Sequence, residues 1–267
     1  SDIIVATIFS IGSYLLLAFV YASMWTTIVA IMGRGVHAAI LISATIAILP
    51  FAGIRALTWS ALGIALLTLL LRQKNKRWRL LIPLLFLLWA NVHGSFLIGI
   101  AYGAWTVCRE RSWRLLLIGM VSIGVTFINP YGLEVYTEIF RTMLDGNLHA
   151  VITEWARFSF PISAILYLFV WIALTVYTNK HQWRRYIRFD SLLFIMSISS
   201  VRMTPLFVLA SLPEMNRMIK EVKKELPHKD RALQKRMGVI AATCLIVASF
   251  LLPIAELFLK RSEGIVY

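Results

Sequence analysis

A seven-residue stretch inside a hydrophobic segment combines a histidine, an asparagine and a serine with a helix-breaking glycine. Its sequence is Trp89-Ala90-Asn91-Val92-His93-Gly94-Ser95, and no charged residue occurs between positions 80 and 108. In hydrocarbon, an amide or imidazole without a partner costs roughly several kcal/mol. The stretch therefore predicts one of two things: a kinked helix whose polar side chains bond to neighbouring helices, or a polar site at a membrane surface.

Two arginines interrupt other apolar segments. Arg202 divides the segment 191–213, and Arg55 separates the segments 38–53 and 56–71. An arginine within a membrane segment is by default a functional hypothesis, and a guanidinium group matches the geometry of a phosphate. The alternatives are a structural ion pair with an exterior carboxylate for Arg202, and an extended side chain that reaches the interface for Arg55.

The remaining candidates could act as acids, bases or turn formers. Glu154, followed by Trp155, is either a general base or an interfacial acid, and Asp2 stands at the start of the chain. Asn129 and Tyr131 belong to Asn129-Pro130-Tyr131-Gly132, which is typical of a turn. His93 could cap a turn, handle protons or bind phosphate.

Metal and nucleotide chemistry lack their usual sequence signals. No other histidine or cysteine lies at a ligand spacing from His93, so no metal site is expected. The sequence also lacks a glycine-rich phosphate loop and a nucleophile-elbow motif. We therefore expect no bound metal or cofactor.

The composition indicates that the elements that position these residues are membrane helices. The 267 residues are 59% hydrophobic and only 15% charged, against about 25% charged in an ordinary soluble domain. Mean hydropathy is +0.76. Long uncharged segments recur along the whole chain, and their residues do not alternate as β-barrel strands do. The predicted fold is an all-α, polytopic bundle of about eight or nine membrane segments, in which 80–108 and 191–213 are short broken pairs.

The charge distribution orients these segments. Arg34 and the segments 72–79, 109–114, 180–190 and 214–236 contain 21 Lys/Arg and 6 Asp/Glu, whereas the rest of the chain holds 6 and 7. Basic loops mark the cytoplasmic side of a membrane protein. The net charge of +14 therefore indicates membrane orientation and not binding to nucleic acid. The polar candidate residues fall on the exterior side.

This orientation divides the chain into three expected regions. Residues 1–213 form the membrane core with an exterior loop at 129–158, residues 214–236 form a basic cytoplasmic loop, and residues 237–267 form a last membrane helix with an exterior tail. Because the sequence begins Ser-Asp without an initiator methionine, we expect an upstream region to belong to the protein.

Several of these pieces, in their order, resemble a known superfamily. The stretch 89–94, Arg55, the turn 129–132, Glu154-Trp155 and Arg202-Met203-Thr204-Pro205 are similar to the pattern of GT-C glycosyltransferases related to polyprenyl-phosphate-mannose protein mannosyltransferases. The resemblance implies inverting transfer of a sugar from a polyprenyl-phosphate donor at the exterior face, with an acid in the first exterior loop as the base.

The resemblance also assigns roles to individual residues. Arg55, His93 and Arg202 would contact the lipid phosphate, and Glu154 or Asp2 would serve as the acid or base. Membrane lipid and the lipid-linked sugar are the expected partners, with an additional membrane subunit as a further option. Two other functions stay open: a transporter or flippase for an anionic lipid or solute, and a non-catalytic subunit of a membrane complex.

Overall fold

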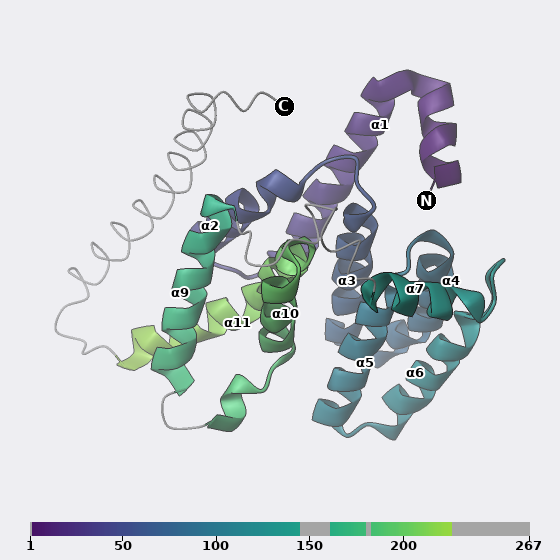
Figure 1. Ribbon diagram of the computed structural model, residues 1–267. Coiled ribbons are helices and arrows are strands. Elements are labelled where there is room, and N and C mark those ends of the chain that lie inside the picture. Colours follow the sequence, from purple (N-terminus) through teal and green to yellow (C-terminus); the bar gives the residue numbers. More distant parts are fainter. Residues whose placement is uncertain (1, 145–160, 180–182, 226–267) are drawn as a thin grey trace. The chain divides into compact units, whose positions relative to one another are not determined.

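The computed structural model describes residues 2–144, 161–179 and 183–225, and these are helices joined by turns (Figure 1). The predicted all-α class is confirmed for this part of the chain. The predicted membrane helix within 237–267, the distal half of the basic loop and Glu154 lie outside the described residues. The chain divides into two compact units, one of residues 1–32 and 52–156 and the other of residues 33–51 and 157–267.

Seven helical elements make up the described part of unit 1, which covers residues 2–32 and 52–144. They are α1 (Asp2–Met32), α3 (Leu57–Arg72), the 3-10 helix η2 (Lys76–Leu81), α4 (Ile82–Val92), α5 (Phe96–Glu110), α6 (Trp113–Val125) and α7 (Glu134–Leu144). The predicted break within 80–108 is therefore confirmed, since α4 ends just before His93 and α5 begins just after Ser95. Pro83 in the first turn of α4 costs no helical hydrogen bond, because the amide at that position has no partner in the helix.

Hydrogen bonds define which helix ends lie together in unit 1. Ser60 at the start of α3 bonds to Ser95 in the α4–α5 turn, and Asn91 at the end of α4 bonds to the Ile128 carbonyl just beyond α6. At the opposite ends, Arg79 bonds to the last residue of α5, Glu110. Helices α3 to α6 therefore alternate in direction, with the turn 93–95 at one end and the basic turns at the other.

α1 covers α3 with a regular stripe of large side chains. Its backbone breaks at Gly12 and Ser13, where Ser13 has φ of 58°. The buried side chains recur at helical spacing and are Leu17, Tyr21, Trp25, Ile28 and Met32. The Tyr21 and Trp59 rings meet edge to face with centroids 6.4 Å apart. The outer side of α1 is apolar as well, with Leu15 and Phe19 largely exposed, as in a helix that faces lipid.

Unit 2 packs α2 (Ala38–Ile48), α9 (Ile162–Asn179), α10 (Phe189–Ser199) and α11 (Thr204–Glu225) together, with the 3-10 helices η1 (Leu49–Phe51), η4 (Trp183–Tyr186) and η5 (Val201–Met203) between them. Its centre contains Tyr167, whose hydroxyl lies 2.8 Å from that of Ser211. α11 continues through Pro213 and across the expected boundary between the membrane core and the basic loop. The interruption at Ser200–Met203 matches the predicted break in 191–213.

The lengths of the described helices identify one candidate membrane span. Among the described residues, α1 alone is long and apolar enough to cross a bilayer by length and composition. The 16 residues of α3 and the 15 of α5 extend roughly 22–24 Å, which is less than the ~30 Å hydrocarbon core. The described helices thus establish an apolar helical protein with one candidate span.

Candidate functional site

Four side chains meet where the α4–α5 turn contacts the start of α3. The Ser60 hydroxyl donates to Ser95 Oγ at 2.7 Å, and Trp89 Nε1 donates to the same oxygen at 3.1 Å. With two donors directed at it, Ser95 Oγ uses its own proton for His93 Nδ1, 2.8 Å away. The Ser95 amide also donates to Nδ1, at 3.1 Å.

These bonds determine the tautomer of His93. Nδ1 accepts two hydrogen bonds, so the neutral imidazole carries its proton on Nε2. The turn residues 93–95 are half-buried, whereas Ser60 is buried. An Nε2–H group in a half-buried ring is a donor suited to an anionic oxygen, and it can also take part in proton transfer.

Trp89 holds the turn by filling a space that two glycines leave. Its ring lies against Gly63 of α3 and Gly99 of α5, where an added Cβ would come within 2.4 Å and 2.5 Å of ring atoms. The ring is buried, and Nε1 reaches Ser95. Gly94 likewise faces Ile139 of α7, at 2.8 Å from a hypothetical Cβ. The glycines thus allow the close packing that positions the turn.

Asn91 and Asn129 stabilise the same end of unit 1 through backbone contacts. Asn91 Nδ2 donates to the carbonyl oxygens of Leu87 at 2.8 Å and Ile128 at 2.9 Å. Asn129 donates to the Thr126 carbonyl and accepts from the Tyr131 amide, both within its own turn. The Tyr131 side chain is 67% exposed. The predicted turn is therefore present, and both amides have structural partners.

The structure brings some of the predicted residues together and leaves others apart. His93, Asn91 and Asn129 lie at one end of unit 1, with Arg55 in the exposed turn that leads into α3. Arg202 lies in η5 of unit 2. The Asp2 side chain and Glu154 lie outside the described residues, so the acidic part of the predicted site is not described.

Sequence reasoning missed a buried ion pair at the basic end of unit 1. The Arg79 guanidinium donates to both carboxylate oxygens of Glu110, at 2.6 Å and 2.8 Å, and to the Leu71 carbonyl. Arg79 is 4% exposed. The hydrogen bond from Arg79 holds the pKa of the Glu110 carboxyl below its usual value. The only signal in the sequence is that Glu110 is the one acid among the basic residues of these turns.

A second buried pair in unit 2 was also missed. Asp190 is 3% exposed, accepts from Trp171 Nε1 at 3.0 Å and from Arg188 Nε at 2.9 Å. Arg188 further donates to Thr175 and stacks on Trp171, with its Cζ 5.8 Å from the ring centroid. Trp171 of α9 and Arg188, the residue before α10, donate the hydrogen bonds to the Asp190 carboxylate, so this cluster connects α9 to the start of α10.

Among the residues that the structure describes, no group of three His, Cys, Asp or Glu side chains could hold a metal ion.

Comparisons of the chain with protein-family models, with curated proteins and with solved structures found no match.

Proposed function

We propose that the chain is a multi-pass membrane protein of the inner membrane that transfers a sugar from a polyprenyl-phosphate donor to an acceptor at the exterior face. The observation that carries the proposal is the contrast between the two ends of unit 1. One end presents His93, Asn91 and Asn129 in uncharged turns, and the other end presents the basic turns 72–79 and 109–114. Basic turns stay in the cytoplasm, which leaves the His93 end for the exterior.

The geometry of His93 suits the phosphate of such a donor. Nδ1 is occupied by Ser95, so the proton resides on Nε2, where it can be donated to a phosphate oxygen. Arg55 precedes α3 at this end of the unit, and a guanidinium group would neutralise charge that develops on the phosphate. The resemblance assigns a phosphate contact to Arg202 as well, which lies in η5 of unit 2 and is tested by its own variant.

The proposed reaction is a single displacement. The acceptor hydroxyl attacks the anomeric carbon, the bond between that carbon and the phosphate oxygen breaks, and the polyprenyl phosphate leaves with the electron pair. A base takes the hydroxyl proton. Glu154 and Asp2 are the candidates for this base, and His93 and Arg55 stabilise the leaving phosphate.

The transfer is tested with membrane vesicles that contain the chain and labelled polyprenyl-phosphate mannose as the probe. Arg202→Ala should abolish depletion of the donor at unchanged expression. Arg141→Ala is the matched control, because Arg141 is an exposed arginine on α7 whose partner is Glu138. Equal depletion by wild type and Arg202→Ala would contradict the proposal.

A second candidate, a transporter or flippase for an anionic lipid, is favoured by the two interrupted helical segments. Both the 93–95 break and the 200–203 break interrupt the α-helical backbone after a short apolar helix, as in the binding sites of many transporters. Translocation of a fluorescent anionic lipid with the sugar still attached would favour this candidate over transfer. A chain that supports neither activity would instead fit a non-catalytic subunit.

A further inference from the structure

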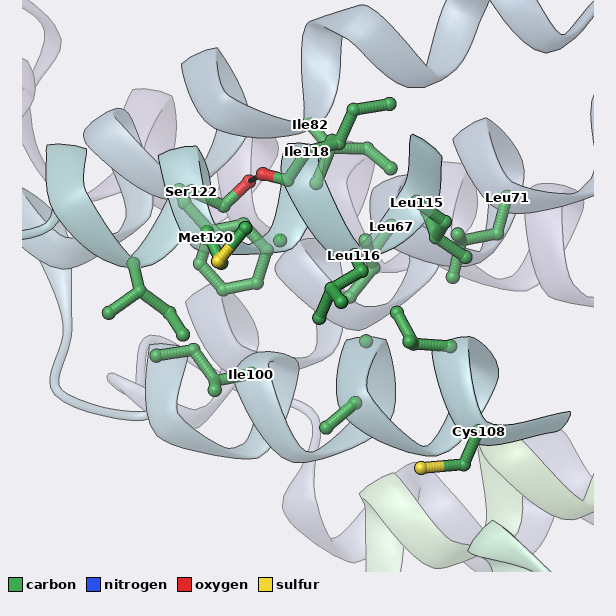
Figure 2. Close-up of a pocket in the computed structure, with 16 residues that line it drawn as sticks. Leu67, Leu71, Ile82, Ile100, Cys108, Leu115, Leu116, Ile118, Met120 and Ser122 are labelled. Atoms are coloured by element: carbon green, nitrogen blue, oxygen red, sulfur yellow. Dashed lines mark hydrogen bonds between the residues drawn. The ribbon is translucent and has the colours of Figure 1, made fainter. Parts of the chain in front are cut away.

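An apolar cavity of about 210 Å³ lies between α3, α4, α5 and α6 of unit 1 (Figure 2). Its walls are aliphatic and aromatic side chains together with Ser122 and Cys108. The Ser122 hydroxyl donates to the Ile118 carbonyl at 2.7 Å, so its hydrogen-bonding need is met within α6. Apolar cavities of comparable size, about 150 Å³, stay dry and take up apolar ligands.

Two glycines create part of this space. Gly103 of α5 and Gly119 of α6 both line the cavity, and a Cβ added to either would meet no atom within 4 Å. The cavity follows α5 from Ile100 to Cys108, a length of roughly 12 Å at 1.5 Å per residue. Its shape is therefore elongated along the helices, as the binding site of a hydrocarbon chain would be.

The outer surface beside the cavity is also apolar. On α6, Leu116, Met120 and Val121 are 49%, 51% and 55% exposed. Such a surface is stable against lipid tails and unfavourable against water. A hydrocarbon chain in the surrounding bilayer can thus reach the cavity without crossing a polar barrier.

One end of the cavity lies beside the basic turns. Leu71, Cys108 and Leu115 line it and are the direct sequence neighbours of Arg72, Arg109 and Arg114. Figure 2 shows Leu71 and Cys108 on one side of the cavity, and Ile100 and Ser122 on the other. The protein surface next to this end of the cavity is therefore positively charged.

At this end of unit 1, the basic residues of the two turns outnumber the carboxylates in those turns that could neutralise them. The turns 72–79 and 109–114 contain eight basic residues and one carboxylate, and that carboxylate, Glu110, bonds to the buried Arg79. The other seven basic residues are exposed. Trp78 and Trp113 are 52% and 66% exposed at the same end, as expected for side chains at the level of lipid headgroups.

We propose that this cavity binds one chain of an anionic phospholipid of the cytoplasmic leaflet, with the phosphate headgroup on the basic turns 72–79 and 109–114. A basic pocket between membrane helices on the cytoplasmic side is the type of site that recognises such lipids. The site is at the opposite end of unit 1 from His93, so this lipid is not the sugar donor. It depends on the membrane insertion and orientation proposed above, and not on sugar transfer.

Lipid retention tests the site directly. The purified chain is reconstituted with equal amounts of phosphatidylglycerol and phosphatidylcholine, re-extracted in mild detergent, and the bound lipids are counted by native mass spectrometry. Wild type should retain phosphatidylglycerol preferentially. Gly119→Leu fills the cavity and should abolish retention, whereas Gly124→Leu, on the same helix with equally open space but outside the cavity lining, should retain the lipid.

A charge variant tests the headgroup. Arg111→Asn combined with Arg114→Gln should reduce the preference for phosphatidylglycerol at least about tenfold, since each basic residue near a membrane contributes about 1 kcal/mol. Asparagine tolerates the left-handed backbone at Arg111, where φ is 50°. Arg141→Gln, which removes a charge on α7, should leave the preference unchanged.

Equal retention by Gly119→Leu and Gly124→Leu, whether both high or both low, would overturn the site. An unchanged preference in the double arginine variant would overturn the assignment of the headgroup. The assay contains no sugar donor, so failure of the transfer reaction leaves its result unaffected, and circular dichroism of each variant verifies that it is folded.

Discussion

At the scale of single residues, the two ring nitrogens of His93 have different roles in the proposed site. Nδ1 accepts from the Ser95 hydroxyl and amide, which fixes the turn and leaves the ring proton on Nε2. The two roles can be separated, because asparagine offers an acceptor near the position of Nδ1 and glutamine offers a donor near that of Nε2.

We predict that His93→Asn folds like wild type and loses donor depletion about 10- to 100-fold. A hydrogen bond to a charged group contributes about 1.5–3 kcal/mol, which corresponds to that range. His93→Gln should retain more activity than His93→Asn. The measurements are donor depletion in vesicles and the unfolding temperature in detergent. A His93→Asn variant with full activity would restrict His93 to a structural role.

The same residues show what the sequence could predict. The polar residues and Gly94 indicate a break at His93-Gly94, because each of them is unfavourable in a continuous apolar helix, and the basic residues on both flanks favour two short passes over one long helix. The partners could not be predicted: Ser60 and Ser95 are ordinary small residues, and their contact depends on how α3 packs against the turn. Asn91 and Asn129, predicted as substrate contacts, have backbone partners that account for their positions.

At the scale of the elements, close packing of α3, α4 and α5 depends on Gly63 and Gly99 on either side of Trp89. Gly99→Ala should destabilise unit 1 by about 1–3 kcal/mol, because its Cβ would lie 2.5 Å from the buried ring. Gly103→Ala on the same helix meets no atom and should stabilise the helix by roughly 0.5–1 kcal/mol. Thermal unfolding followed by circular dichroism compares the two, and equal shifts would contradict the packing role of Trp89.

The Arg79–Glu110 pair links the turn before α4 to the end of α5. Glu110→Gln should cost about 2 kcal/mol, near the middle of the range for hydrogen bonds to charged groups, because the Glu110 side chain is still 35% exposed. Glu138→Gln is the control, since the Glu138–Arg141 pair on α7 is exposed on both sides. It should change the stability by less than about 0.5 kcal/mol.

The same pair predicts a pH dependence of stability. Hydrogen bonding to Arg79 lowers the pKa of Glu110 in the folded protein below its usual 4.5. The unfolded chain therefore binds the proton first, and the contribution of the pair is complete above pH 4.5 and is lost as the pH falls through the lowered pKa. The difference in unfolding temperature between wild type and Glu110→Gln should shrink as the pH is lowered through this range. A difference that stays constant down to pH 3 would contradict the ion pair.

Element boundaries were predictable where glycine, proline and charge coincide, and less so elsewhere. Arg72 and the turn at 93–95 mark helix ends as predicted, whereas α11 continues through Pro213 to Glu225. The proline loses one helical hydrogen bond, and packing of α11 against α2, α9 and α10 outweighs that loss. Neither buried ion pair was predictable from the sequence. Tertiary packing determines which of the many arginines pairs with Glu110 and which pairs with Asp190.

At the scale of the whole molecule, the proposed function depends on the orientation of the chain in the membrane. The described helices of unit 1 separate uncharged polar turns from basic turns, and the proposed lipid and sugar-donor sites take their assignment to opposite leaflets from that separation. α3, α5 and α6 have 16, 15 and 13 residues and extend roughly 20–24 Å, so the proposed membrane insertion of unit 1 requires a bilayer that becomes thinner around it. The charge count predicts this orientation from the sequence.

Labelling of single cysteines with a membrane-impermeant maleimide tests the orientation most directly. In a chain whose two native cysteines are replaced by Cys108→Ser and Cys244→Ser, Tyr131→Cys reports on the His93 end and Lys74→Cys on the basic end. Both positions are exposed. Tyr131→Cys should react in intact cells, and Lys74→Cys should react only after permeabilisation. Labelling of both positions from the same side, or the reverse pattern, would contradict the proposed orientation.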